Sequence, residues 1–317
     1  WAKILLINTL AVIVLLVVLG VASRVILHKV YNRSFDSSLI EDNRYYTSAG
    51  IKPNASGMVW GKLFNSDEFG GRKGCKAFDK KKKTRLFIGD SVTEGVGVDD
   101  SSTFTSFYAK HIDSLNILNI SLIGWSTYDY VNAIKSFVAD TTNPANLEHI
   151  TLVYCLNDVY GPVKTGDLPK MGRQGFIGWI AGFLQQNYAT YKLVKLFAFK
   201  HANSYYRYDK AFYKEGNPYF ETAMRLLKTA DSLCNAAHIG FDVLILPYRS
   251  QLAGPDDKDQ TPQIMMAKYC TQNHIRFAYP SIVFNNLPRP EGLYLFSDEI
   301  HFSERGHKAI GYYLLSQ

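Results

Sequence analysis

The sequence predicts an α/β protein whose parallel sheet has five strands and which is preceded by one N-terminal transmembrane helix. Three observations lead to this prediction. Short apolar runs alternate with helical segments after Lys83, the N-terminal region holds a long uncharged stretch, and 47% hydrophobic content over 317 residues is ample for one sizeable core. Strands that alternate with helices in this way form parallel sheets covered on both faces. We therefore expect a three-layer α/β/α domain.

The N-terminal segment has the length and composition of a membrane span. Residues 4–23 contain no charge over 20 positions, and a helix rising 1.5 Å per residue would cross a hydrocarbon core of about 30 Å with that length. A cleaved signal peptide is the alternative, because Gly20-Val21-Ala22 resembles a small-residue cleavage site. The apolar part of a signal peptide is normally only about 7–15 residues long. We therefore assign residues 1–30 to a transmembrane anchor.

The expected strands are short runs of apolar and β-favouring residues that end in glycine or polar residues. They cover residues 84–88, 116–121, 149–155, 241–247 and 275–279. The expected helices lie between and after them, near residues 103–113, 128–139, 219–237 and 261–273, with a last helix from Ser303.

The first expected strand runs into residues 87–91 (Phe-Ile-Gly-Asp-Ser), which places Ser91 just beyond the carboxyl edge of the sheet. Reactive groups of α/β proteins lie at this edge. Gly-Asp-Ser alone is a weak signal, because an N-cap serine gives the same pattern. Near the C-terminus, however, Asp298 precedes His301 by three residues, so its carboxylate can hold one imidazole nitrogen while the other faces a serine hydroxyl. The three residues form a candidate nucleophile, base and orienter.

Two further motifs follow the next two expected strands. Gly124 comes after residues 116–121, and Asn157-Asp158 comes after residues 149–155. With these blocks the chain resembles the SGNH, or GDSL-like, hydrolase superfamily, which carries Ser, Gly, Asn and His in this order. The matches fall within residues 85–313, about two thirds of the chain, and are Ser91, Gly124, Asn157 and His301.

The resemblance implies a flavodoxin-like sheet with strand order 2-1-3-4-5 and an acyl-serine mechanism. Ser91 would be the nucleophile, His301 the general acid–base and Asp298 the orienter. The backbone N–H groups of Ser91 and Gly124 and the side-chain amide of Asn157 would form the oxyanion hole. No cofactor is implied, and we expect no metal site, because the other histidines lack ligand spacing.

One position departs from the family pattern. The third block usually reads Gly-x-Asn-Asp, and here Cys155 stands in place of the glycine. Asn157 keeps its place, but the resemblance does not determine the local backbone conformation or the shape of the pocket.

The chain divides into an anchor (1–30), a basic stalk or cap (31–83) and a catalytic domain (84–317) with an aromatic-rich insertion at 160–218. The lysine run 80–83 is either a solvated face or a contact for anionic headgroups or an acidic polysaccharide. Aromatic residues interleaved with lysine in the insertion are typical of an interfacial helix, a lid, a surface for a membrane partner, or packing on the sheet. A net charge of +7 fits an anionic partner, but no nucleic-acid-binding module accompanies the lysines.

Basic residues flank the anchor unevenly. Lys3 precedes it, and three basic residues follow it, Arg24, Lys29 and Arg33. By the positive-inside rule this would place the domain in the cytoplasm. The resemblance to membrane-tethered members of the family favours the extracytoplasmic side, which is the side we expect.

The cysteines do not indicate whether the domain lies in a reducing or an oxidising compartment. Cys234 and Cys270 fall on neighbouring expected helices and are candidates for a disulfide, although sequence does not determine connectivity.

Three functions remain after these observations. The first is a serine esterase that removes an acyl group, with acetyl favoured, from an envelope glycan or a related small ester. The second is an O-acyltransferase that modifies a cell-surface polysaccharide together with a membrane acyltransferase partner. Both would use Ser91, Asp298 and His301, so the motifs do not separate them. The third is a non-catalytic subunit of a membrane complex that has kept the fold.

Overall fold

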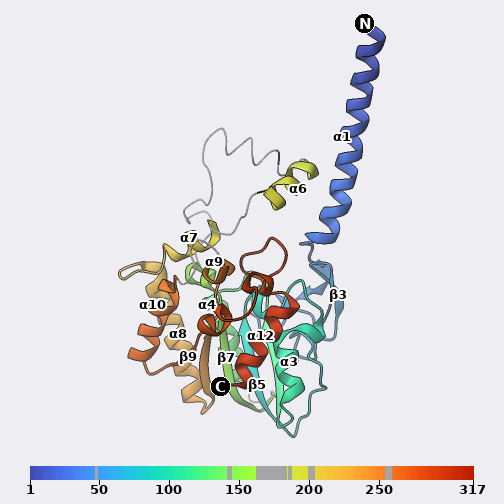
Figure 1. Cartoon of the computed structure of the whole chain (residues 1–317). Coiled ribbons are helices and arrows are strands. Elements are labelled where there is room, and N and C mark those ends of the chain that lie inside the picture. The colour runs from blue at the N-terminus through green and yellow to red at the C-terminus, as the bar shows by residue number, and fades with distance from the viewer. Residues whose placement is uncertain (47–48, 141–144, 162–183, 185–187, 199–203, 254–258) are drawn as a thin grey trace.

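A computed structural model describes the chain except residues 47–48, 141–144, 162–183, 185–187, 199–203 and 254–258. Helix α1 (Ala2–Val30) projects from the domain at the upper right of Figure 1. Residues 2–29 are long and apolar enough to cross a membrane, and no residue of the most apolar window is buried against the rest of the chain. This exposure is expected of a helix whose apolar side chains are surrounded by lipid rather than by protein.

The centre of the domain is a parallel sheet of five strands in the order β6-β5-β7-β8-β9. The strands are β5 (Lys83–Gly89), β6 (Leu115–Ser121), β7 (Leu147–Tyr154), β8 (Gly240–Ile245) and β9 (Arg276–Ala278). Counted within the domain, this is the order 2-1-3-4-5, so the fold prediction is confirmed. Strand β5 lies between β6 and β7 and is buried on both faces, as the apolar run at Leu86, Phe87 and Ile88 requires.

Helices cover both faces of the sheet (Figure 1). On one face α3 (Phe104–His111) packs against α12 (Glu304–Leu315), and on the other α4 (Thr127–Ala139) packs against α8 (Pro218–Ala236). The remaining α-helices are α2 (Ser91–Glu94), α6 (Ala189–Ala198), α7 (Ser204–Lys210), α9 (Arg249–Ala253), α10 (Thr261–Gln272) and α11 (Ser281–Asn285).

Side-chain caps explain where the larger helices begin. The Thr103 hydroxyl accepts a hydrogen bond from the Ser106 N–H at the start of α3, and Ser303 caps α12 in the same way. Asn217 caps α8 and is followed by Pro218, a residue suited to the first helical position.

The segment between anchor and sheet holds two antiparallel pairs of short strands that the sequence did not predict. Strand β1 (Ile40–Glu41) pairs with β2 (Gly50–Ile51), and β3 (Ser56–Val59) pairs with β4 (Lys62–Asn65). The β3–β4 turn consists of Trp60 and Gly61, with φ of 51° and 75°. Two successive positive φ values are typical of the tight turn that matches the twist of a hairpin.

The lysine run at residues 80–83 lies at the amino-terminal ends of the parallel strands, and the anchor lies on the side of their carboxyl-terminal ends. It leads into the amino end of β5, whereas the segment after α1 contacts residues near the carboxyl ends. The run is therefore on the side of the domain away from the anchor. The two candidate disulfide partners, Cys234 and Cys270, are both free and buried, so that pairing is not made.

Most of the 160–218 insertion, including the aromatic run at 176–183, lies outside the described residues. Its described part includes α6, which packs beside α1, where the Ser23 hydroxyl donates to Thr190 Oγ1 at 3.2 Å. Further along, Tyr206, Phe212 and Tyr213 are buried. They pack in the core and do not form an exposed aromatic surface on which sugar rings could stack.

Candidate active site

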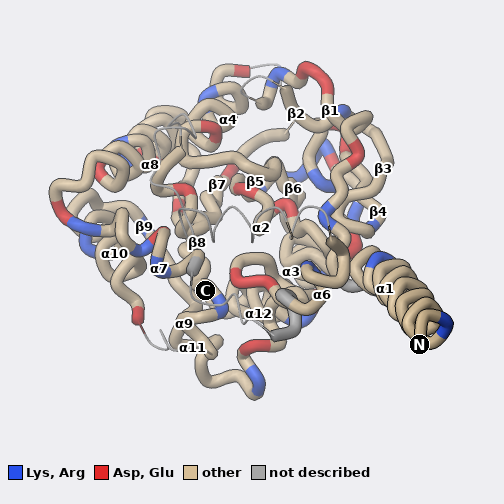
Figure 2. Tube along the Cα trace, turned by 90° about the horizontal axis from the view of Figure 1, so that it is seen from above, with Lys and Arg blue, Asp and Glu red and all other residues tan. Residues whose placement is uncertain are grey.

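Ser91 sits on a sharp turn from strand to helix. Strand β5 ends at Gly89, and Ser91 is the first residue of α2, near the middle of the domain when it is seen from above (Figure 2). The Asp90 side chain caps this helix by accepting the Val92 N–H at 2.9 Å. A Cβ at Gly89 would lie 2.0 Å from Thr93 Oγ1, so only glycine allows the chain to turn this tightly. The serine is only 7% exposed.

The structure brings Ser91, His301 and Asp298 together in one chain of hydrogen bonds. Ser91 Oγ lies 2.9 Å from His301 Nε2, although the two residues are 210 positions apart. On the other side of the ring, His301 Nδ1 lies 3.0 Å from Asp298 Oδ2. With the Nδ1 proton directed at the carboxylate, Nε2 is free to accept the serine proton.

Backbone geometry holds Asp298 in place. Its Oδ1 accepts the N–H groups of Ile300 and His301, both at 2.8 Å, so the Asp-x-x-His spacing folds into a compact turn. Burial alone would raise the pKa of Asp298, but His301, Arg33 and these N–H donors outweigh burial and hold the pKa well below its ordinary value. Asp298 is therefore ionised at every pH at which the His301 imidazole needs a negatively charged partner.

Arg33 is a neighbour of this site that the sequence did not reveal. Its guanidinium forms an ion pair with Asp298 Oδ2 and lies 3.7 Å from the centre of the Trp60 ring. Trp60 in turn packs edge-on against the His301 ring, with the ring centres 4.5 Å apart. In the sequence, Arg33 counted only as a charge flanking the anchor, because no local pattern links it to a residue 265 positions later.

Gly124 and Asn157 lie on the two sides of the serine. Gly124 follows β6 and Asn157 follows β7, and these strands are the two direct neighbours of β5. Gly124 has φ of 82°, and a Cβ placed on it would meet no atom within 4 Å, so its backbone is open to a ligand. The buried Oδ1 of Asn157 has no hydrogen-bond partner among the described residues. Both predicted oxyanion donors are therefore at the serine's edge of the sheet.

Two buried carboxyl groups support this side of the site. Glu94 Oε2 accepts the N–H of Ile123, next to Gly124, at 2.9 Å. Asp158 Oδ2 accepts the Cys155 N–H at 2.8 Å and thereby fixes the turn that carries Asn157. The sequence included Asp158 only as part of a motif, and Glu94 was missed because its role depends on the adjacent loop.

Burial shifts the pKa values of these two carboxyl groups upward. Burial raises the pKa of Glu94 to about 8, although nearby Arg72 opposes the rise. Arg72 directs its N–H groups to the carbonyls of Glu94, Gly95 and Val98 and to the Asp100 carboxylate, rather than to the Glu94 carboxyl. Burial likewise raises the pKa of Asp158 well above its ordinary value, and the Asp90 carboxyl adds to the rise.

Cys155 is accommodated at the position where the family pattern has glycine. It is buried and has φ of −98°, a conformation that any residue adopts. The substitution therefore leaves the turn and Asn157 in place.

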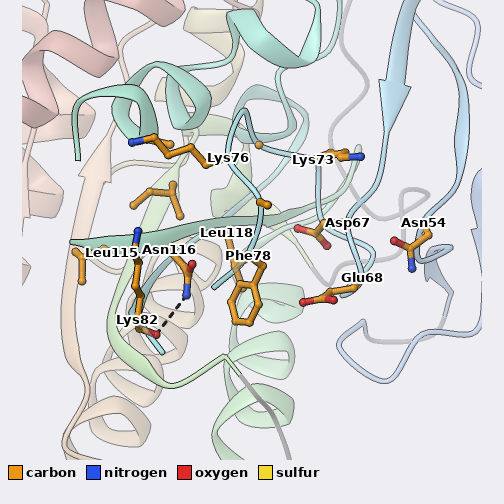
Figure 3. A pocket seen from close by; sticks show the side chains of 14 residues that line it. Asn54, Asp67, Glu68, Lys73, Lys76, Phe78, Lys82, Leu115, Asn116 and Leu118 are labelled. Carbon is orange, nitrogen blue, oxygen red and sulfur yellow. Dashed lines mark hydrogen bonds between the residues drawn. The ribbon is translucent and has the colours of Figure 1, made fainter. Parts of the chain in front are cut away.

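A second hollow is separate from this site (Figure 3). It has a volume of about 280 Å³ and opens beside edge strand β6, between lysine and carboxylate side chains such as Lys73, Lys82 and Glu68. None of the five predicted site residues lines it. Within the described part of the chain, no group of three or more His, Cys, Asp or Glu side chains is arranged to hold a metal ion.

No protein-family model and no curated protein matches this sequence. The chain is similar to the solved structure of a lipolytic G-D-S-L family member from Veillonella parvula DSM 2008 (17% identity, 74% of this chain and 97% of that chain, TM-score 0.44). It is also similar to the acetylxylan esterase Axe2 from Geobacillus stearothermophilus (15%, 74% and 93%, 0.42). A third similar structure is that of TesA (12%, 74% and 97%, 0.44).

Proposed function

We propose that the chain is a membrane-anchored serine ester hydrolase of the SGNH type. The observation that carries this proposal is the continuous hydrogen-bonded series from Ser91 through His301 to Asp298. A serine hydroxyl is a weak nucleophile on its own and needs an adjacent base that is itself oriented by a third group. This chain supplies all three at the carboxyl edge of the sheet.

The geometry supports a two-step reaction. His301 Nε2 takes the proton from Ser91 Oγ as the oxygen attacks the acyl carbon, and Asp298 stabilises the imidazolium that forms. The N–H groups of Ser91 and Gly124 and the amide of Asn157 receive the oxyanion. His301 then protonates the leaving alcohol, and a water molecule activated by the same imidazole releases the acyl group.

The substrate we propose is a small acyl ester, an acetyl ester above all, on an envelope glycan or a related molecule at the membrane surface. The small exposure of Ser91 favours a short acyl chain, and α1 holds the site beside a bilayer. The catalytic domain is placed on the extracytoplasmic side in this proposal. A membrane protein that contacts α1 or α6 would be its partner.

An O-acyltransferase is the second candidate, because its acyl-serine intermediate needs the same three residues and differs only in the acceptor. The location of the site on the anchor's side of the domain favours this candidate, since a membrane-borne acceptor would reach it there (Figure 1).

The test is hydrolysis of p-nitrophenyl acetate by the detergent-solubilised full chain, with and without oligosaccharide acceptors. Ser91→Ala should lower release at least ~10³-fold, because the nucleophile is lost. Ser232→Ala, which changes a serine on the exposed face of α8, is the matched control and should leave the rate unchanged.

The outcomes separate the candidates. Release that depends on Ser91 and ignores the acceptors supports the hydrolase. Release that rises with an acceptor, together with acetylated sugar in the mass spectrum, supports the transferase. Equal release by wild type and Ser91→Ala, with no fluorophosphonate labelling of Ser91, would overturn both candidates and favour a non-catalytic subunit.

A further inference from the structure

A cleft of about 720 Å³ lies between the end of α1 and the domain. Its walls come from the last turn of α1, the residues just after it, the β3–β4 hairpin and the loop around Phe296. The basic residues that line it are His28, Lys29, Arg33 and Lys62, and the described lining holds no acidic side chain. The ionisable side chains that line the cleft are therefore basic rather than acidic.

The cleft lies at the outer boundary of the lipid headgroup layer. The uncharged stretch of α1 ends at Ser23, and at 1.5 Å per residue Lys29 follows about 9 Å later. Headgroup layers add roughly 5–8 Å to each side of a hydrocarbon core of about 30 Å. Helix α6 packs beside α1 at Ser23, and Lys192 of α6 lies over the ring of Tyr31 at 5.3 Å. Polar and aromatic groups thus gather where the apolar span ends, as they do at a membrane surface.

One cation of the cleft is available to a ligand. The Arg33 guanidinium is bound to Asp298, and Lys62 Nζ lies 2.8 Å from Asp99. Lys29, in contrast, is exposed and has no ion-pair partner within the part of the chain that the structure describes. A long lysine side chain at the end of a membrane helix extends its ammonium into the headgroup layer.

Apolar side chains stand beside these cations. Met58 and Phe296 both line the cleft and are 46% and 48% exposed. On the outer face of the hairpin, Met58 pairs across the strands with Leu63, which is 50% exposed. Exposed apolar side chains next to basic ones suit a ligand with an anionic head and a hydrocarbon part.

Two residues that line the cleft also contact the candidate active site. Trp60 forms part of its wall and packs against the ring of His301. Arg33, which also lines the cleft, is bound to Asp298.

From these observations we propose that the juxtamembrane cleft binds the phosphate-bearing headgroup of an anionic membrane lipid. The ammonium of Lys29 pairs with the phosphodiester, and Met58 and Phe296 contact the upper part of the acyl chains. This binding goes beyond the proposed ester hydrolysis and does not require Ser91 to react.

The test uses the full chain in nanodiscs that contain phosphatidylglycerol and phosphatidylcholine in equal amounts. Native mass spectrometry then counts the lipids of each kind that stay bound after the disc is removed. The wild type should retain phosphatidylglycerol in preference to phosphatidylcholine. Lys29→Gln should lower this preference about fivefold, because the ammonium that pairs with the phosphodiester in the cleft is lost.

Arg24→Gln is the matched control, because it removes the same charge from the same end of α1 at a residue that does not line the cleft. It should keep the wild-type preference. An equal loss in both variants would show a general attraction of basic residues to anionic lipid and would overturn the proposal. No preference in the wild type would overturn it as well.

Two further measurements separate lipid binding from binding of a free phosphate ester and from ester hydrolysis. Soluble glycerol 3-phosphate should not displace the bound lipid, and displacement by it at micromolar concentration would show a site for a free phosphate ester instead. Ser91→Ala should bind lipid like the wild type, so a failure of ester hydrolysis and a failure of lipid binding are distinguishable.

Discussion

The two sides of Ser91 carry buried carboxyl groups whose pKa values are shifted in opposite directions. On the base side, Asp298 meets His301 and Arg33, and its pKa stays well below the ordinary value despite burial. On the oxyanion side, Glu94 and Asp158 are equally hidden from water, but burial raises their pKa values, that of Glu94 to about 8. The difference is whether a cation donates hydrogen bonds to the carboxylate itself.

This difference matches what each side has to do. A negative charge next to the imidazole stabilises the imidazolium that forms during attack. A negative charge next to the oxyanion would repel it, so the groups that support Gly124 and Asn157 serve best when they are neutral. Burial without a cation partner is the simplest way to keep a supporting carboxyl group uncharged.

The largest expected effect comes from removing the charge on the base side. Asp298→Asn should lower kcat by about 10⁴-fold, because the amide holds the wrong tautomer of His301 and does not stabilise its charged form. Steady-state kinetics with p-nitrophenyl acetate measure this. Asp242→Asn is the control, since Asp242 pairs with His149 at 2.7 Å away from the site, and it should change kcat less than about threefold. Similar losses in the two variants would refute the special role of Asp298.

The next effect tests the oxyanion side. Asn157→Ala should lower kcat about 10²–10³-fold, or about 2.7–4 kcal/mol, because one donor to the oxyanion is lost. KM should stay close to the wild-type value, since the donor acts in the transition state. Asn235→Ala, on the exposed face of α8, serves as the control. A change confined to KM would contradict the assigned role.

A smaller effect is expected when the ion pair with Asp298 is weakened. Arg33→Gln should lower kcat/KM about tenfold, or about 1.4 kcal/mol, which is close to the lower end of the roughly 1.5–3 kcal/mol that a hydrogen bond to a charged group contributes. The pKa of Asp298 should rise, because Arg33 is one of the groups that hold it below its ordinary value. Arg33→Lys should restore part of the rate. An equal loss in Arg33→Lys would contradict a role for the charge.

The smallest effect concerns the neutral carboxyl group on the oxyanion side. The pKa of Glu94 is raised on folding, so its contribution to stability is complete below about pH 4.5 and is lost as pH rises through about 8. The loss of this contribution lowers Tm between pH 5 and 8. In Glu94→Gln this fall in Tm should be smaller by at least ~2 °C, which is the change that about 1 kcal/mol of unfolding free energy produces in a domain of this size. Thermal unfolding followed by circular dichroism measures the slope. An unchanged slope would show that Glu94 is ionised in the folded protein.

Local patterns made most of the fold predictable. The five apolar runs became strands in the expected order, with boundaries that moved by one or two residues. Asp298 and His301 were found because their spacing of three lets one turn join them. The hairpin at Trp60 and Gly61 was missed, since its tight turn lacks the usual Asn-Gly signal.

What the sequence did not reveal depends on contacts between distant segments. Arg33 reaches Asp298 only because the chain after α1 returns to the carboxyl edge of the sheet. Glu94 supports Gly124 only through the N–H of Ile123, which no spacing rule predicts. The raised pKa of Glu94 follows from its burial, while the nearby Arg72 directs N–H groups to backbone carbonyls instead of to this carboxyl group, and both details appear only in three dimensions.

The central claim is that Ser91 carries the acyl group during turnover. The most direct measurement is mass spectrometry of peptides from the full chain, quenched in acid shortly after mixing with p-nitrophenyl acetate. The account predicts one acetyl group on the peptide that contains Ser91, and none on that peptide in Ser91→Ala. Hydrolysis by the wild type with no trapped acetyl group, or with acetylation elsewhere and unchanged turnover in Ser91→Ala, would contradict it.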